Sequence, residues 1–398
     1  MHEDYSPRFS LFWRSYMNIK ILYGITILIF ATVFGVRPIT SLYANLIGAT
    51  MWHISLITLA YSIGPLLIAV HIGRYVDRYG EKGPILFGSI GLLVATALPF
   101  FTESILGLIF SQLLLGLSQI FAIVSLQNGV GKAANSGGRD KAIGLFSLFS
   151  SGGMLLGPLI AGSAADFWSY KIAFVVLAIA PFISIILTLF LKNHQQQVNS
   201  KVNEEKTPFL EIIGQKDIRN TLLAGMIILA ALDIFYVYFP LYAESIGLSA
   251  SKIGFLLSMM AAGNMIARFY IESVLKLFGR VKALSYCMLI GAFAYALVGF
   301  TSNFAILFVF VLIIGCCLGI TQPISIMIAY NLAPKNQTAE LLGIRLASNR
   351  LAQTVLPFVF ANMSTLWGLG AIFGFKAFLV AITAWNSKSI KEREEVVK

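Results

Sequence analysis

Charged side chains inside long apolar runs are the residues of this sequence best placed to do chemistry. A charge at the centre of a membrane-spanning helix costs about 2.5–3.5 kcal/mol on insertion scales, so each one calls for a partner or a function. They are candidates for pairing, for proton uptake or for holding a charged ligand. The set is Arg37, Asp233, Arg268, Glu272, Arg345, Arg350 and Lys376. The sequence offers no physical explanation for Lys376.

Arg37 and Asp233 carry opposite charges at similar depths. They lie roughly 24 Å and 20 Å from the starts of their runs at a helical rise of about 1.5 Å per residue. This placement predicts that the two residues form the ion pair of an outer gate. Alternatively, they have separate roles, in which Asp233 takes up a proton and Arg37 holds an anion. A purely structural ion pair is the third alternative.

Arg350 lies roughly 15 Å into its own run. With Arg37 it predicts a cavity that attracts an anionic or phosphorylated substrate through bidentate hydrogen bonds. The alternative is that Arg345 and Arg350 brace an inner gate against Asp77 or Glu340. Amides and phenols can orient a ligand without a charge. The uncharged candidates for the cavity are Gln112, Gln119, Tyr236, Asn264 and Gln322.

The elements that must hold these residues are membrane-spanning helices. Hydrophobic residues make up 58% and charged residues 12% of the 398 residues, against about a quarter charged in a soluble domain. Apolar runs of about 20 residues, the length that crosses a bilayer, recur along the chain. They are continuous rather than alternating, which excludes barrel strands. The sequence predicts an all-α membrane protein with twelve transmembrane helices.

Lys and Arg alternate between the predicted loops. With both termini placed in the cytoplasm, the inner loops and tails hold 22 of these residues and the outer loops hold 2, as the positive-inside rule requires. This distribution accounts for the net charge of +11 and argues against nucleic acid as a partner. The first run is full length and is expected to stay as an anchor. Cys287, Cys316 and Cys317 lie inside runs, so we expect neither a disulfide nor a metal site, and no cofactor.

The two halves of the sequence repeat. A shift of 199 residues places Gly80 on Gly279 and Pro158 on Pro357. Two six-helix lobes in the same orientation predict a parallel repeat about an axis along the membrane normal, with a site between the lobes. We assign residues 1–191 to the first lobe, 192–219 to a cytoplasmic linker, and 220–398 to the second lobe and tail.

Gly73, Asp77, Arg78 and Gly80 form a charged turn between the second and third runs. Their spacing resembles the signature of the major facilitator superfamily, and the resemblance extends over essentially the whole chain. It implies that the first and seventh helices line a central cavity. It also implies that the turn is a conformational latch, in which the Asp77 carboxylate meets the start of the eleventh helix and Gly80 permits a sharp turn.

Glu81 departs from this pattern, because the family usually has Arg or Lys at this position. We hypothesise a charge-swapped bridge from Glu81 to Lys132, Arg139 or Lys141. A solvated loop charge of little energetic consequence is the alternative.

Gly153, Gly157, Pro158 and Gly162 resemble a motif typical of the antiporters in this family. Small residues at this spacing let helices touch and bend, so generic glycine packing is the alternative. Gln112 stands where drug/proton antiporters commonly carry an Arg, which weakens the case for proton coupling.

These features predict a secondary transporter that works by alternating access, with ion-driven efflux of a drug or metabolite as the leading function. No nucleotide-binding loop is visible, and we do not expect an enzyme. An importer or exchanger of an organic anion is the alternative within transport, and a non-transporting sensor or lipid-handling protein is the alternative of another class. We expect a monomer in the plasma membrane, with a small-molecule substrate, protons and the lipid bilayer as partners.

Overall fold

Long helices account for nearly all of the described chain. The computed structural model describes residues 7–133, 139–191, 214–332 and 338–390. The helices of the first half are α1 (Pro7–Leu46), α2 (Met51–Tyr79), α3 (Lys82–Phe101), α4 (Ile105–Ala133), α5 (Arg139–Phe167) and α6 (Tyr170–Leu189). Those of the second half are α8 (Lys216–Ser245), α9 (Ala250–Phe269), α10 (Ile271–Phe278), α11 (Arg280–Val298), α12 (Phe304–Leu332), α13 (Thr338–Trp367) and α14 (Leu369–Ser387).

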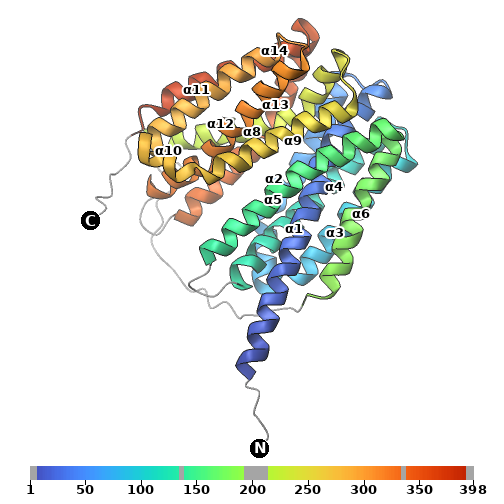
Figure 1. Ribbon diagram of the computed structural model, residues 1–398, viewed down its shortest axis with the longest axis vertical. Helices are drawn as coiled ribbons and strands as arrows, with labels where there is room; N and C mark the ends of the chain where they lie inside the picture. Colours follow the sequence, from blue (N-terminus) through green and yellow to red (C-terminus); the bar gives the residue numbers. More distant parts are fainter. Residues whose placement is uncertain (1–6, 134–138, 192–213, 333–337, 391–398) are drawn as a thin grey trace, which may run out of the picture.

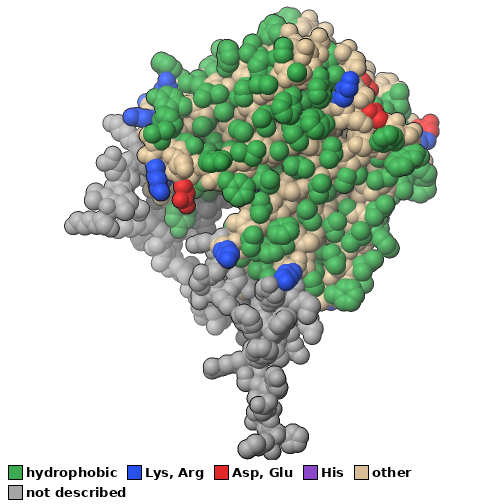
Figure 2. Space-filling view, viewed as in Figure 1, with side chains coloured by type: hydrophobic (Ala, Val, Ile, Leu, Met, Phe, Trp, Pro, Cys, Tyr) green, Lys and Arg blue, Asp and Glu red, His purple; other side chains and the backbone are tan. Residues whose placement is uncertain are grey.

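Eleven of these helices are long and apolar enough to cross a membrane. Figure 2 shows one face of the molecule, on which hydrophobic side chains predominate and charged side chains lie near the margins. The chain is therefore a multi-pass membrane protein. The remaining one of the twelve predicted spans, the eleventh in chain order, is α13, which has the required length but carries Arg345, Asn349 and Arg350 among its residues.

Helices α1–α6 pack on one another and helices α8–α14 pack on one another. The two groups lie at an angle in Figure 1, with α5 beside α9 at their junction. The main contacts between them are α5 with α9, α2 with α13 and α1 with α8. Because α8 begins at Lys216, residues 216–219 belong to this helix and not to the linker that we predicted.

Two glycines related by the repeat make equivalent turns. Gly80 ends α2 with a φ of 85°, and Gly279 ends α10 with a φ of 69°. Few residues other than glycine adopt this backbone region. The second half differs just before its turn, because the helix is interrupted at Tyr270, between α9 and α10. Arg268 and Glu272 therefore do not share one continuous helix face.

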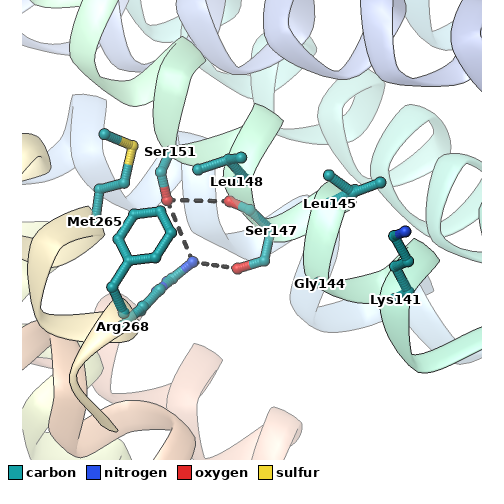
Figure 3. Close-up of a pocket in the computed structure, with 9 residues that line it drawn as sticks. Lys141, Gly144, Leu145, Ser147, Leu148, Ser151, Met265 and Arg268 are labelled. Carbon is teal, nitrogen blue, oxygen red and sulfur yellow. Dashed lines mark hydrogen bonds between the residues drawn. The ribbon is translucent and has the colours of Figure 1, made fainter.

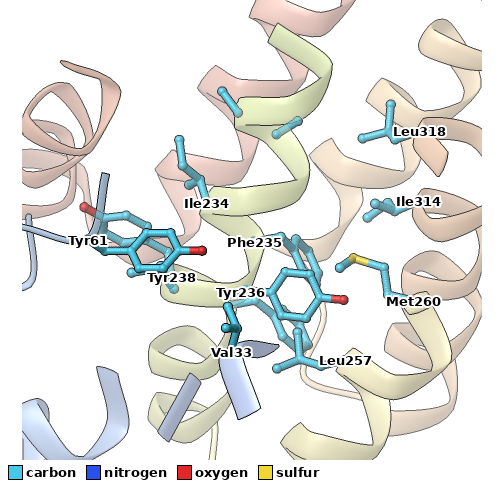
Figure 4. Close-up of a cluster of buried hydrophobic side chains, with 14 of the residues drawn as sticks. Val33, Tyr61, Ile234, Phe235, Tyr236, Tyr238, Leu257, Met260, Ile314 and Leu318 are labelled. Atoms are coloured by element: carbon cyan, nitrogen blue, oxygen red, sulfur yellow. The ribbon is translucent and has the colours of Figure 1, made fainter. Parts of the chain in front are cut away.

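Helix α8 lies at the centre of the hydrophobic core. Its residues from Ile234 to Ala243 are all buried. Figure 4 shows Phe235 and Tyr236 of this helix among side chains of α1, α9 and α12. A helix that is buried on nearly every side is well suited to carry a central site, since its neighbours hold each side chain in place.

Candidate substrate cavity

A cavity of about 510 Å³ lies between the two halves. The first half contributes residues of α1, α4 and α5 to its wall, and the second half contributes residues of α8, α9, α12 and α13. Much of the wall is aromatic or flexible and apolar, through side chains such as Phe30, Phe34, Phe146, Met154 and Met260. A cavity of this size and lining suits a small amphiphilic molecule.

An ion pair between the halves forms part of this wall. The Arg37 guanidinium of α1 donates through Nη1 to Oδ1 of Asp233 on α8. Arg37 is 3% exposed, whereas Asp233 lines the cavity. The guanidinium also lies 4.4 Å from the ring centroid of Tyr61, and the Tyr61 hydroxyl donates to Gln119. The Asp233 carboxylate thus faces the cavity, and the Arg37 guanidinium that balances its charge is buried behind it.

A second contact between the halves is related to this ion pair by the repeat. The 199-residue shift places Phe34 on Asp233 and Arg37 on Tyr236. Phe34 and Tyr236 meet edge to face, with ring centroids 4.9 Å apart. The two pseudo-equivalent contacts therefore differ in chemistry, one ionic and one aromatic. The Tyr236 hydroxyl is buried and makes no hydrogen bond with a described residue.

Arg350 and Gln322 both line the cavity. Arg350 donates to Oε1 of Gln353 at 2.9 Å, which leaves its charge without a carboxylate among the described residues. Arg345 behaves differently, because it is buried within the second half and donates to Ser325 at 3.0 Å. The side chains of Asp77 and Glu340, our alternative partners for these arginines, lie outside the described part of the structure.

Gln112 and Gln119 do not line the cavity, contrary to our prediction. Gln112 donates to Thr40 of α1 at 3.0 Å, and Gln119 accepts from Tyr61 of α2. The two amides share a helix face with Gly116, whose backbone packs against the carbonyl of Tyr61. This close contact turns the face toward α1 and α2, so both amides serve helix packing.

Lys376 lies in the core of the second half. It is completely buried, its Nζ makes no hydrogen bond with a described residue, and it lies 5.4 Å from the ring centroid of Phe360. Lys376 is thus a buried amine with no ion-pair partner among the described residues.

The latch residues surround the end of α2. Gly73, Asp77 and Arg78 lie on that helix and Gly80 follows it, but the side chain of Asp77 is outside the described part of the structure. Glu81 is buried, with its Cγ close to the position that a Cβ at Gly129 would take. Neither its Oε2 nor Nζ of Lys132 has a hydrogen-bond partner among the described residues. The bridge between Glu81 and a base therefore remains a prediction.

The glycines of the antiporter-type motif make close contacts between helices. A Cβ added at Gly153 or Gly157 would overlap the backbone of α1, and one added at Gly162 would overlap Ala250 of α9. Pro158 lies between them, and its carbonyl oxygen packs against Gly254. Gly153 and Gly157 thus join α5 to α1 of the first half, and Gly162 joins α5 to α9 of the second half.

The halves also meet at the ends of the helices opposite the cavity. Asn45 at the end of α1 donates to Glu244 at the end of α8 at 2.9 Å. Asp166 near the end of α5 accepts from the backbone amides of Ala250 and Ser251, both at 2.9 Å, at the start of α9. This end of the molecule is closed.

Some cavity residues were not predicted from the sequence, namely Phe30, Phe34 and Gln127. The repeat relates two of them to other residues of the cavity, because the shift places Phe30 on Leu229 and Gln127 on Ile326, and all four line the cavity. Among the described residues, no three His, Cys, Asp or Glu side chains lie close enough to hold a metal ion.

Comparisons with known proteins agree with this architecture. The family model described as Major Facilitator Superfamily matches residues 22–353 and again residues 221–393. The multidrug resistance protein MdtG of Citrobacter koseri is 26% identical over 387 residues, which cover 91% of this chain and 92% of that protein. The MFS-type transporter MJ1560 of Methanocaldococcus jannaschii is 22% identical over 375 residues, or 90% of this chain and 95% of that protein. A crystal structure of the nucleoside transporter NupG superposes with a TM-score of 0.81 over 94% of this chain and 100% of that chain, at 10% identity.

Proposed function

The chain belongs to the Major Facilitator Superfamily and is a secondary transporter, and on this premise we propose that it exports small amphiphilic molecules in exchange for protons. The observation that carries the proposal is the cavity between the halves, whose wall is mainly aromatic and apolar and contains the Asp233 carboxylate. Relatives such as MdtG are named for multidrug resistance, which supports efflux as the direction.

The structure suits the inward-facing state of such a cycle. The cavity is lined by Ile143 and Ser147 near the start of α5 and by Arg268 near the end of α9. The opposite ends of the same helices are joined through Asp166. With both termini in the cytoplasm of a plasma-membrane protein, as the distribution of Lys and Arg supports, the cavity faces inward. We propose that the monomer is the working unit.

Proton exchange is assigned to the Arg37–Asp233 pair. While the carboxylate is ionised, Arg37 of the first half holds it. Protonation of Asp233 removes the charge that binds this arginine, so the contact between α1 and α8 weakens and the halves become free to rearrange.

The test is transport by the purified protein in liposomes, using a fluorescent amphiphilic cation. We expect a pH gradient to accelerate transport by the native protein. Asp233→Asn should abolish this acceleration while leaving exchange of labelled for unlabelled substrate intact. Loss of both activities would instead assign Asp233 to folding or substrate binding, and a native protein that ignores the gradient would refute proton coupling.

An importer or exchanger of an organic anion is the second candidate. It is favoured by Arg268 and Arg350, which line the cavity, where the only described carboxylate, Asp233, is already paired. The same liposomes distinguish the two functions, because an anionic amphiphile should then be transported faster than a cationic one of similar size. Arg350→Gln should slow the anion and spare the cation.

A further inference from the structure

A second cavity, which we call the side pocket, lies next to the contact between α5 and α9. Its volume is about 430 Å³. It shares only Ser147 and Arg268 with the central cavity. Figure 3 shows Lys141 and Arg268 at the two ends of the row of residues that lines it, with Gly144 between them.

The polar part of the side pocket is positively charged. Arg268 donates through Nη1 to the hydroxyls of Ser147 and Ser151, the latter at 3.2 Å. A guanidinium has five N–H donors, and the remaining ones have no acceptor among the described residues. No described carboxylate forms an ion pair with Arg268 or Lys141. Two neutral hydroxyls do not balance these charges, so the pocket is complementary to an anion.

The rest of the side pocket is apolar and lies on the outer surface of the helices. Leu145, Leu148, Met265 and Phe269 complete its lining. Leu148 and Phe269 are exposed, the latter by 68%, in helices that cross the membrane. Lys141 lies near the start of α5 and Arg268 near the end of α9. These two ends lie on the same side of the molecule, where a membrane-spanning chain meets the lipid headgroups.

We propose that the side pocket binds the phosphate headgroup of an anionic phospholipid. The phosphate meets Arg268 and Lys141, and the acyl chains lie along Leu148 and Phe269. Basic pockets between transmembrane helices at the cytoplasmic surface are suited to anionic headgroups. On the orientation proposed above, the lipid comes from the cytoplasmic leaflet. The apolar wall favours a lipid over a free phosphate, which would leave that wall in contact with water.

The experiment is native mass spectrometry of the full-length protein in neutral detergent, titrated with phosphatidylglycerol. Phosphatidylcholine and glycerol 3-phosphate serve as probes for a zwitterionic headgroup and for a headgroup without acyl chains. Lys141 and Gly144 are the positions to change, because neither lines the central cavity. A Cβ at Gly144 meets nothing within 4 Å, so Gly144→Phe has room to fold while filling the pocket.

We expect the native protein to retain one phosphatidylglycerol molecule in preference to phosphatidylcholine. Lys141→Gln should weaken this binding about fivefold, the factor that corresponds to about 1 kcal/mol for one basic residue near a lipid surface, and Gly144→Phe should weaken it further. Lys252→Gln at the opposite end of α9 and Gly374→Phe, whose Cβ also meets nothing within 4 Å, should bind like the native protein.

Three results would overturn the assignment. Equal retention by the native protein and both pocket variants would place the lipid elsewhere. Equal affinity for phosphatidylcholine would remove the role of charge. Displacement of the lipid by glycerol 3-phosphate at matched concentration would identify a soluble phosphate as the ligand. Lys141→Gln keeps the proposal testable if Gly144→Phe fails to fold.

Discussion

Two contacts between the halves are related by the repeat but built from different groups. We call them the α5–α9 seam and the α2–α13 seam. The 199-residue shift places Pro158 on Pro357 and Ser55 on Gly254. In each seam, the carbonyl of the proline in one half meets the equivalent position in the other half.

The α5–α9 seam combines close backbone packing with hydrogen bonds, such as that from the Ser258 hydroxyl to the Leu155 carbonyl at 2.6 Å. Gly254 approaches the Pro158 carbonyl, and Gly162 approaches Ala250, so closely that a Cβ at either glycine would overlap the neighbouring backbone. In the α2–α13 seam, Ser55 donates to the Pro357 carbonyl at 2.8 Å and Tyr238 donates to it at 3.1 Å. Ser62 and Thr354 form a further hydroxyl pair at 3.2 Å.

This difference indicates how the halves move. Hydroxyl groups can exchange a partner across the seam for water when the seam opens, so their separation costs little. Interlocked helix backbones lose many dispersion contacts at once when they separate, and hydration of the polar groups does not restore those contacts. We infer that the α2–α13 seam opens on the closed face of the molecule, while the α5–α9 seam acts as the pivot.

The largest expected effect is at Gly254. Gly254→Val places methyl groups where the Pro158 carbonyl lies, and neither backbone can yield easily, so we expect a loss of at least about 1–3 kcal/mol in the free energy of unfolding. Thermal unfolding of the detergent-solubilised protein measures it. Gly374→Val, at a position with open space, is the matched control. If both variants melt together, the α5–α9 seam is not tightly packed.

The α2–α13 seam should tolerate change better. Ser55→Ala and Tyr238→Phe should each cost about 1 kcal/mol, the value of a typical hydrogen bond. The two hydroxyl oxygens lie 3.0 Å apart, and because each has one hydrogen to donate, they share the Pro357 carbonyl as acceptor. When one hydroxyl is removed, the other can strengthen its bond to this carbonyl. The double variant should therefore lose more than the sum of the single losses when the three are compared by thermal unfolding.

Spin labels can show which seam opens. We expect labels at His53 and Asn362, on the α2–α13 side, to report longer distances in the Ser55→Ala, Tyr238→Phe double variant. Labels at Trp168 and Lys252, on the α5–α9 side, should be unaffected. A shift in the second pair alone would reverse the assignment of pivot and gate.

The fold was largely predictable from the sequence because a bilayer restricts what an apolar run can do. Each run must form a helix of about 20 residues to satisfy its own backbone. The depths of Arg37 and Asp233 predicted that they could meet, and they do. The repeat predicted which residues of the two halves are equivalent.

The rotation of each helix was harder to predict. Gln112 and Gln119 looked like cavity residues because they are polar, but Gly116 on the same face packs against α2 and turns them away from the cavity. The direction of a helix face depends on such contacts with a neighbour, which one sequence does not reveal. For the same reason the sequence did not predict that Arg268 meets Ser147 of another helix.

An effect smaller than that of the Ser55→Ala, Tyr238→Phe double variant is expected at Asp166, which closes the outer end of the α5–α9 seam. Its carboxylate accepts from two amides at the start of α9 and so acts as a helix cap supplied by the other half. Asp166→Ala should cost about 1 kcal/mol of stability, as removal of an N-cap does. Asp166→Asn keeps an acceptor and should cost less. If both variants unfold at the native temperature, this cap does not contribute to the seam.

The smallest effect is expected at Glu103, which belongs to neither seam. It pairs with Lys171 inside the first half, and this hydrogen bond lowers the pKa of the Glu103 carboxyl. A lowered pKa stabilises the protein above the unfolded-state value, and the contribution disappears as the pH falls through the folded-state value. Because the Glu103 side chain is largely exposed, water screens the pair. Glu103→Gln should therefore unfold at the native temperature at neutral pH and leave both spin-label distances unchanged. A measurable change in either distance would show that the Glu103–Lys171 contact within the first half influences the seams. The movement of the two halves could then not be explained by the two seams alone.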